Sequence, residues 1–104
     1  MMANGIVVGT TPNIIYTFKS ISSSDIVTAI LTIKRDDEIL LRKELADATV
    51  DENSISWKLT QEDTLAVGVG STTFMCNWVT GDGTRGVSEE TSVFFEHNHM
   101  EEVI

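Results

Sequence analysis

The chain has one cysteine and two histidines, the residue types that most often supply nucleophiles and metal ligands in proteins. Cys76 alternates with Phe74 and Trp78, a two-residue period that is typical of a strand with one buried face. A nucleophilic thiol needs a base and an electropositive environment, and aromatic neighbours supply neither. We therefore expect Cys76 to be a buried structural thiol, and a single cysteine cannot form an intramolecular disulfide.

The two histidines, His97 and His99, fall near the C-terminal end of the sequence. In an extended segment they place two imidazoles on one side, with Glu96, Glu101 and Glu102 nearby. Such a cluster could bind zinc or nickel weakly. Histidines in a terminal tail are more often solvated, so we predict no native metal site.

Oxygen ligands that suit calcium gather in one predicted loop, which contains Asp47, Asp51, Glu52 and Asn53. This loop lacks the ordered spacing and the glycine of an EF-hand. The adjacent acids Glu62 and Asp63 would point apart on a helix, and a place near its N-terminal end accounts for both. The sequence has no Ser-His-Asp order, no glycine-rich phosphate loop and no Cys-x-x-Cys pair. We predict that the protein is not an enzyme and has no catalytic residue and no cofactor.

The 104 residues are enough for one domain, which we expect to span residues 1–96, followed by a tail of residues 97–104. With 41% hydrophobic and 22% charged residues, the composition is that of a folded globular protein. The net charge of −9 repels phosphate groups, so we expect no nucleic-acid partner. The sequence begins without the basic region of a signal peptide, and no apolar run approaches the ~20 residues of a membrane span. We therefore expect no membrane partner and folding in the cytoplasm.

Residues 54–65 combine a strand pattern with the start of a helix. Ile55, Trp57 and Leu59 alternate with polar residues, which indicates a half-buried strand. Thr60 and Asp63 then have the spacing of a capping box, in which the threonine accepts from an early amide of a short helical turn. We expect Leu65 on this turn to fold back over the sheet edge.

The longest apolar run, residues 26–34, is rich in β-branched residues and predicts a strand. Its expected inward face consists of Val27, Ala29, Leu31 and Ile33. Ile26 and Ile30 would then point outward, where another chain or the short helix could cover them. An Asp36-Asp37 turn leads into a returning strand.

Residues 72–80 form a further predicted strand, with Phe74, Cys76 and Trp78 on one face. A Gly-Asp-Gly turn joins it to a strand over Arg85–Phe95, in which Phe94 points outward. Counting all segments, six or seven short strands and one short helical turn predict an all-β fold, an antiparallel immunoglobulin-like β-sandwich. We expect Trp57 and Trp78 to be largely buried in its core. The Cys…Trp…Cys signature of true immunoglobulin domains is absent.

Several motifs follow one another in a recognisable order: Thr11-Pro12, a strand with an aromatic centre, the Asp36-Asp37 hairpin, the segment from Ile55 to Leu65, a strand containing Met75-Cys76-Asn77-Trp78, a Gly-Asp-Gly turn and a terminal Glu-Val-Ile. This order resembles a family of small virion structural proteins of tailed phages and prophages of Gram-positive bacteria. The position of Asn77 is often glutamine in that family, and a histidine-rich tail is not typical of it. The resemblance covers nearly the whole chain.

The resemblance implies a non-enzymatic structural or assembly protein that acts through protein–protein contacts, first in the host cytoplasm and then in the virion. Its partners would be other virion proteins, or a further copy of itself in a homo-oligomer. The apolar residues expected to support such contacts are Ile26, Ile30, Phe94, Val103 and Ile104. The alternative is a carbohydrate-binding or adhesion module on the same β-sandwich, because the fold alone does not decide the function.

Overall fold

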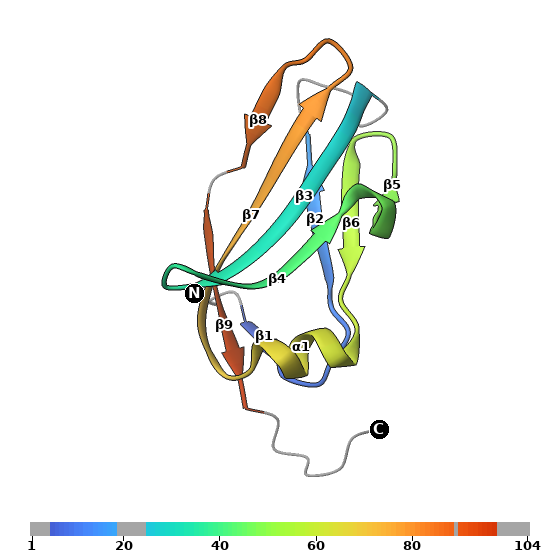
Figure 1. The fold of residues 1–104 in the computed structure, drawn as a ribbon. Helices are drawn as coiled ribbons and strands as arrows, with labels where there is room; N and C mark the ends of the chain where they lie inside the picture. Colours follow the sequence, from blue (N-terminus) through green and yellow to red (C-terminus); the bar gives the residue numbers. More distant parts are fainter. Residues whose placement is uncertain (1–4, 19–24, 89, 98–104) are drawn as a thin grey trace.

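The structure is a computed structural model that describes residues 5–18, 25–88 and 90–97. Within these residues the chain forms nine strands, which build two sheets that face each other over a common core (Figure 1). The larger sheet has the order β1-β9-β7-β3-β4, with β8 also paired to β7. The smaller sheet has the order β2-β6-β5. The predominance of strands confirms the predicted all-β class.

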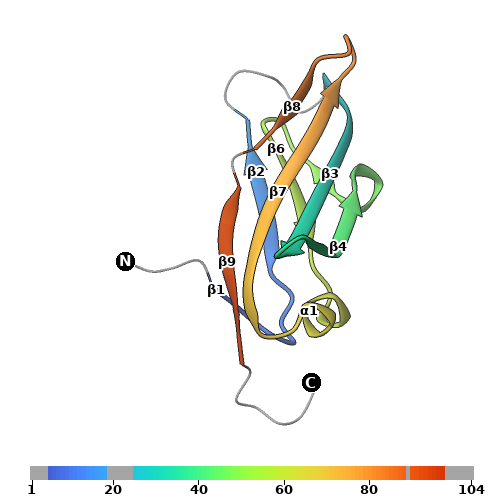
Figure 2. The ribbon, with the colours of Figure 1, turned by 60° about the vertical axis from the view of Figure 1, so that its left-hand side comes forward.

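The strands of the larger sheet are β1 (Gly5–Val7), β3 (Ile26–Arg35), β4 (Glu38–Glu44), β7 (Gly70–Thr80), β8 (Arg85–Val87) and β9 (Thr91–Glu96). Those of the smaller sheet are β2 (Asn13–Thr17), β5 (Thr49–Val50) and β6 (Ser54–Lys58). A 3-10 helix, η2 (Leu45–Asp47), follows β4, and the helix α1 (Gln61–Val67) follows β6. Figure 2 shows the same two sheets from another side, with α1 at one end of them.

One pairing departs from the predicted antiparallel arrangement. β1 pairs with β9 in parallel, so the larger sheet is mixed, whereas the other pairings of the described strands are antiparallel. The first strand therefore joins the larger sheet and not the neighbouring β2. A sequence pattern of alternating residues carries no information on strand direction, which is why the prediction missed this pairing.

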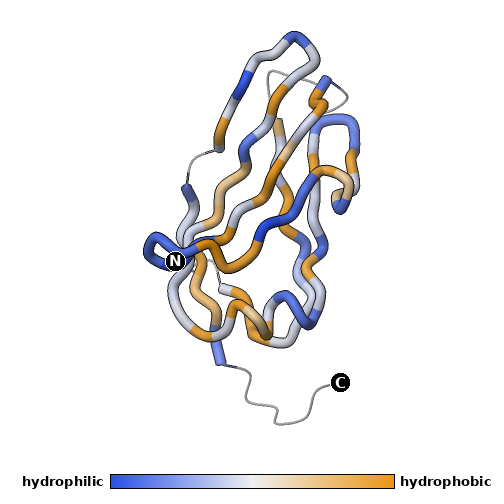
Figure 3. The backbone as a smooth tube through the Cα atoms, viewed as in Figure 1, coloured by the Kyte–Doolittle hydropathy of each residue, from blue (hydrophilic) through white to orange (hydrophobic). Residues whose placement is uncertain are grey.

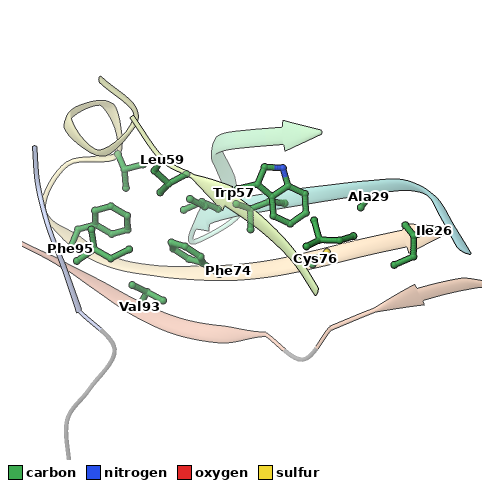
Figure 4. Close-up of a cluster of buried hydrophobic side chains, with 13 residues drawn as sticks. Ile26, Ala29, Trp57, Leu59, Phe74, Cys76, Val93 and Phe95 are labelled. Carbon is green, nitrogen blue, oxygen red and sulfur yellow. The ribbon is translucent and has the colours of Figure 1, made fainter. Parts of the chain in front are cut away.

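The core between the sheets is built by alternate residues of facing strands. Figure 4 shows Trp57 and Leu59 on one side of it and Phe74, Cys76 and Phe95 on the other. The Trp57 side chain is only 1% exposed, which confirms its predicted burial. Trp78 is less buried than predicted. It packs against this core from its margin, where its ring lies 5.1 Å from the ring of Phe18 in a T-shaped arrangement.

The inward face of β3 differs from the prediction at its start. A register shift between Ile26 and Thr28 reverses the alternation, so Ile26 is 6% exposed and Val27 is 59% exposed. Ile26 therefore belongs to the core and is not an outward-facing residue, and Ile30 is partly buried. Beyond the bulge, Ala29, Leu31 and Ile33 point inward as predicted.

The predicted helix start is confirmed. Thr60 Oγ1 accepts a hydrogen bond from the Asp63 amide at 3.0 Å, and Asp63 Oδ2 accepts one from the Thr60 amide at 2.8 Å. The prediction for Leu65 is wrong, because this side chain is 45% exposed. Thr64 and Val67 cover the core in its place, since residues three apart share one face of a helix.

The predicted strand over Arg85–Phe95 is divided into β8 and β9. Val87 is exposed, whereas Val93 and Phe95 are buried, so the alternation does not continue across the break. Phe94 points outward as predicted, at 45% exposed. Of the predicted tail, only His97 belongs to the described residues, and Val103 and Ile104 lie outside them.

Candidate functional site

The thiol that the sequence offered as a possible nucleophile has a structural role in the core. Cys76 is fully buried as expected, and burial raises the pKa of its thiol to about 11. Its backbone amide donates a hydrogen bond to Ser88 Oγ at 2.8 Å. The Ser88 hydroxyl therefore accepts from the backbone of Cys76 and not from its thiol. A buried thiol with a raised pKa carries little thiolate at neutral pH, which makes it a poor nucleophile.

Those acids and histidines of the candidate metal sites that the structure describes are not gathered at one place. Asp47 Oδ2 accepts from the Glu44 amide at 3.2 Å as part of the cap of η2. His97 lies exposed beyond β9, while His99, Glu101 and Glu102 fall outside the described residues. Across residues 5–18, 25–88 and 90–97, no three His, Cys, Asp or Glu side chains lie together in a way that could hold a metal ion.

The feature with the clearest capacity for binding is the free edge of β2. This strand pairs with β6 along one side only, in the register that joins Ile14 to Trp57 and Tyr16 to Ile55. At the two ends of this pairing, Leu59 N–H donates to the Pro12 carbonyl at 2.9 Å and Phe18 N–H donates to the Asn53 carbonyl at 2.7 Å.

These two bonds fix the direction of every backbone group in β2. In an antiparallel pair, successive residues alternate between facing the partner strand and facing away from it. Since Pro12 and Phe18 face β6, Ile14 and Tyr16 must also face it. The N–H and C=O groups of Asn13, Ile15 and Thr17 therefore point along the sheet away from β6, and within the described residues no strand pairs with them.

The other described sheet edges have the features by which proteins prevent unwanted pairing. β5 has two residues, and β1 and β8 have three each, so these edges are short. β4 is long, but it carries the charged residues Glu38, Arg42, Lys43 and Glu44. Figure 3 shows a strongly hydrophilic stretch within β4. β2 has none of these protections, because it is five residues long and has no charged side chain.

A groove runs beside this free edge. It has a volume of about 360 Å³ and is lined by residues of β1, β2, β7 and β9, among them Ile6, Ile14, Tyr16, Phe74 and Val93. The groove exists because β1 covers only one end of β9, pairing through Gly5–Val7 with Phe94–Glu96. The neighbouring part of β9, including Thr91 and Val93, stays open toward β2.

The surface of β2 itself is apolar at its centre. Ile15 is 61% exposed, the highest value among the large hydrophobic side chains that the structure describes. The aromatic Tyr16 points inward, where its ring lies 6.2 Å from that of Trp57, and burial raises its pKa to about 12. The strand thus presents one exposed isoleucine between two uncharged polar residues, Asn13 and Thr17.

Sequence reasoning identified a strand with an aromatic centre after Pro12, which is β2, but missed its free edge. One signal was available, because the first 18 residues contain no Asp, Glu, Lys or Arg in a chain with a net charge of −9. Of the residues that were predicted to form a contact surface, those that the structure describes are not brought together. Ile26 lies in the core, and Phe94 lies on β9, outside the lining of the groove.

Comparison with known proteins does not assign this chain to a family. No protein-family model matches this chain, and no curated protein matches it either. Among the described residues, the structure contains no helix with the length and apolar character that crossing a membrane requires.

Proposed function

We propose that this chain is a non-enzymatic structural or assembly protein that acts through protein–protein contacts. The sequence resemblance suggests its setting, a particle of a tailed phage or a prophage. The free edge of β2 is the observation that supports the proposal, because an unprotected edge with unpaired backbone groups is a ready template for another strand.

We also propose that the fold is an immunoglobulin-like sandwich in its topology. In such domains the second, fifth and fourth strands form one sheet in the order B-E-D, and the order G-F-C-C′ occurs in the other. The order β2-β6-β5 corresponds to the first sheet, and β9-β7-β3-β4 corresponds to the second. A first strand beside β2 would complete the smaller sheet, but in this chain β1 pairs with β9.

This assignment gives the free edge a physical cause. The place beside β2 is the place of strand A in the complete sandwich, and no described strand occupies it because β1 lies in the other sheet. A contact that supplies a strand there would extend the smaller sheet and cover the groove. Small sandwiches with such an edge are suited to repeated contacts in an assembly.

The alternative, a carbohydrate-binding or adhesion module, would need aromatic rings exposed on a concave surface. Among the described aromatic side chains, Phe94 is the one that is exposed, and it does not line the groove. The geometry therefore favours a protein partner over a sugar.

The proposal is tested by asking where the protein is found. The genes on either side of its own gene should encode portal, capsid or tail proteins. Particles purified after induction of the prophage should contain the chain in a fixed ratio to a major virion protein, measured by quantitative mass spectrometry. Absence of the chain from such particles would overturn the assignment to the virion.

A further inference from the structure

We propose that two copies of this chain form a dimer in which their β2 strands pair antiparallel about a two-fold axis at Ile15. The inference rests on the proposed function only in that it takes protein contacts to be the mode of action. It identifies the partner as a second copy of the chain and the contact as the free edge of the smaller sheet.

The backbone of β2 is complementary to itself in this register. The outward-facing groups belong to Asn13, Ile15 and Thr17, which are spaced evenly about Ile15. When two such strands run antiparallel, Ile15 lies opposite Ile15 of the second copy, and each Asn13 lies opposite a Thr17. Each of these pairs can exchange two hydrogen bonds, so every outward N–H and C=O of the three residues finds a partner.

The side chains of this register are also compatible. It places isoleucine against isoleucine and uncharged polar residues against each other, so it opposes no like charges. This matters because each copy has a net charge of −9, and most other approaches would bring carboxylates together. The uncharged strand is therefore where two copies can meet at the least electrostatic cost, and added salt should strengthen the dimer by screening the remaining repulsion.

The groove leaves room beneath the added strand. Ile14 and Tyr16 of each copy face the inner side of the sheet, so the same residues of the added strand face the side on which the groove lies. The pairing joins two three-stranded sheets into one continuous sheet. Because β2 has only five residues, the contact is short, and we expect a weak dimer that exchanges readily with the monomer.

The test compares Ile15→Lys with the control Ile39→Lys by sedimentation equilibrium over a range of concentrations. Both side chains are mostly exposed, at 61% and 58%, so both variants should fold, which circular dichroism checks. Ile15→Lys places two ammonium groups opposite each other at the axis and should weaken dimerisation by about tenfold or more. Ile39→Lys adds the same charge on β4 and should leave the dissociation constant close to that of the wild type.

A covalent test detects the contact even when the dimer is weak. The wild-type Cys76 is buried, so a cysteine introduced at position 15 would be the accessible thiol. Under mild oxidation Ile15→Cys should form a disulfide-linked dimer much faster than Ile39→Cys, because directly opposed residues of an antiparallel pair lie within disulfide reach.

Equal cross-linking of the two cysteine variants, or equal self-association of the two lysine variants, would overturn the proposed dimer. A wild-type chain that stays monomeric at all concentrations would do the same. These outcomes leave the proposed function standing if the chain is still found in particles. Absence from particles together with an Ile15-dependent dimer would overturn the proposed function and support the dimer.

Discussion

The indole Nε1 of Trp57 donates a hydrogen bond to the backbone carbonyl of Glu44 at 2.9 Å. Trp57 lies at the centre of the smaller sheet, and Glu44 is the last residue of β4, at the edge of the larger one. The bond therefore joins the two sheets at the point where the chain leaves β4 for η2. A buried tryptophan needs such a partner for its N–H, and here the partner also fixes how the sheets meet.

Replacing Trp57 should be severely destabilising. Trp57→Ala should lower the free energy of unfolding by ~3–5 kcal/mol, a large part of the total for a domain of this size. Trp57→Phe keeps an aromatic ring but loses the bond to Glu44, so we expect a loss of about 1–3 kcal/mol. Urea denaturation measures both values, with Phe94→Leu as an exposed control. A Trp57→Ala protein with the melting temperature of the wild type would contradict this account of the core.

The helix cap should make stability depend on pH. Burial alone would raise the pKa of Asp63, but hydrogen bonds from the Thr60 backbone amide, Lys43 and the Thr60 side chain, together with the Lys43 charge, hold it below its ordinary value of 3.8. Lys43 Nζ lies 3.0 Å from Asp63 Oδ2 and so joins β4 to α1. A carboxyl group whose pKa is lower in the folded protein stabilises the fold above its unfolded pKa, and this stabilisation is lost as the pH falls through the folded pKa.

We therefore expect the melting temperature to fall as the pH is lowered from about 5 towards 2. Asp63→Asn should be less stable than the wild type at pH 7 and should show a smaller decrease over that range. Differential scanning calorimetry at several pH values makes the comparison, with Asp37→Asn in the exposed β3–β4 turn as the control. If the melting temperatures of Asp63→Asn and Asp37→Asn depended on pH in the same way, the cap would not contribute to the pH dependence of stability.

Arg35 at the end of β3 is expected to hold the end of α1. Its guanidinium donates to the carbonyls of Val67 at 3.0 Å, Ser71 at 3.2 Å and Gly68 at 3.3 Å. These carbonyls lie at or just beyond the C-terminal end of the helix, where a positive charge is favourable.

Arg35→Ala should lower the free energy of unfolding by about 1–3 kcal/mol, because these hydrogen bonds have a charged donor. Arg35→Lys should recover only part of the loss, since an ammonium group cannot make the same forked contact. The control is Arg42→Ala, whose only ion pair among the described residues is an exposed contact at 4.0 Å, and this change should cost less than about 0.5 kcal/mol. Equal costs for Arg35→Ala and Arg42→Ala would contradict the proposed role.

Cys76 should be inert in the folded protein. Its burial and its pKa of about 11 mean that almost no accessible thiolate exists at pH 8. A disulfide reagent should therefore label no thiol in buffer and one thiol in denaturant, with the labelling rate in buffer set by unfolding. Rapid stoichiometric labelling of the folded protein would mean that the thiol is accessible.

Local sequence patterns predicted the strands and the helix of this fold more reliably than they predicted which strands pair with one another. The alternation of Ile55, Trp57 and Leu59 and the pair Thr60–Asp63 each depend on contacts within a few residues, and the structure has both as predicted. The bulge that turns Val27 outward depends on how β3 meets β7, which no short window of sequence contains. The exposure of Val87 likewise depends on the break between β8 and β9.

The free edge of β2 could not be predicted from the sequence for the same reason. Whether β2 is an edge depends on where β1 pairs, and β1 pairs with β9, whose sequence lies more than eighty residues away. The absence of charge in residues 1–18 could have directed attention to this region. It could not have shown which backbone groups of β2 are free.

Amide hydrogen exchange, followed by NMR as the protein concentration is raised, tests the role of β2 most directly. At low concentration the amides of Ile14 and Tyr16 should be protected by β6, and those of Asn13, Ile15 and Thr17 should exchange rapidly. At high concentration the three rapid amides should become protected, whereas in Ile15→Lys they should stay rapid. Protection of these amides that does not change with concentration, or rapid exchange at every concentration, would contradict the proposed pairing of β2 with a second copy.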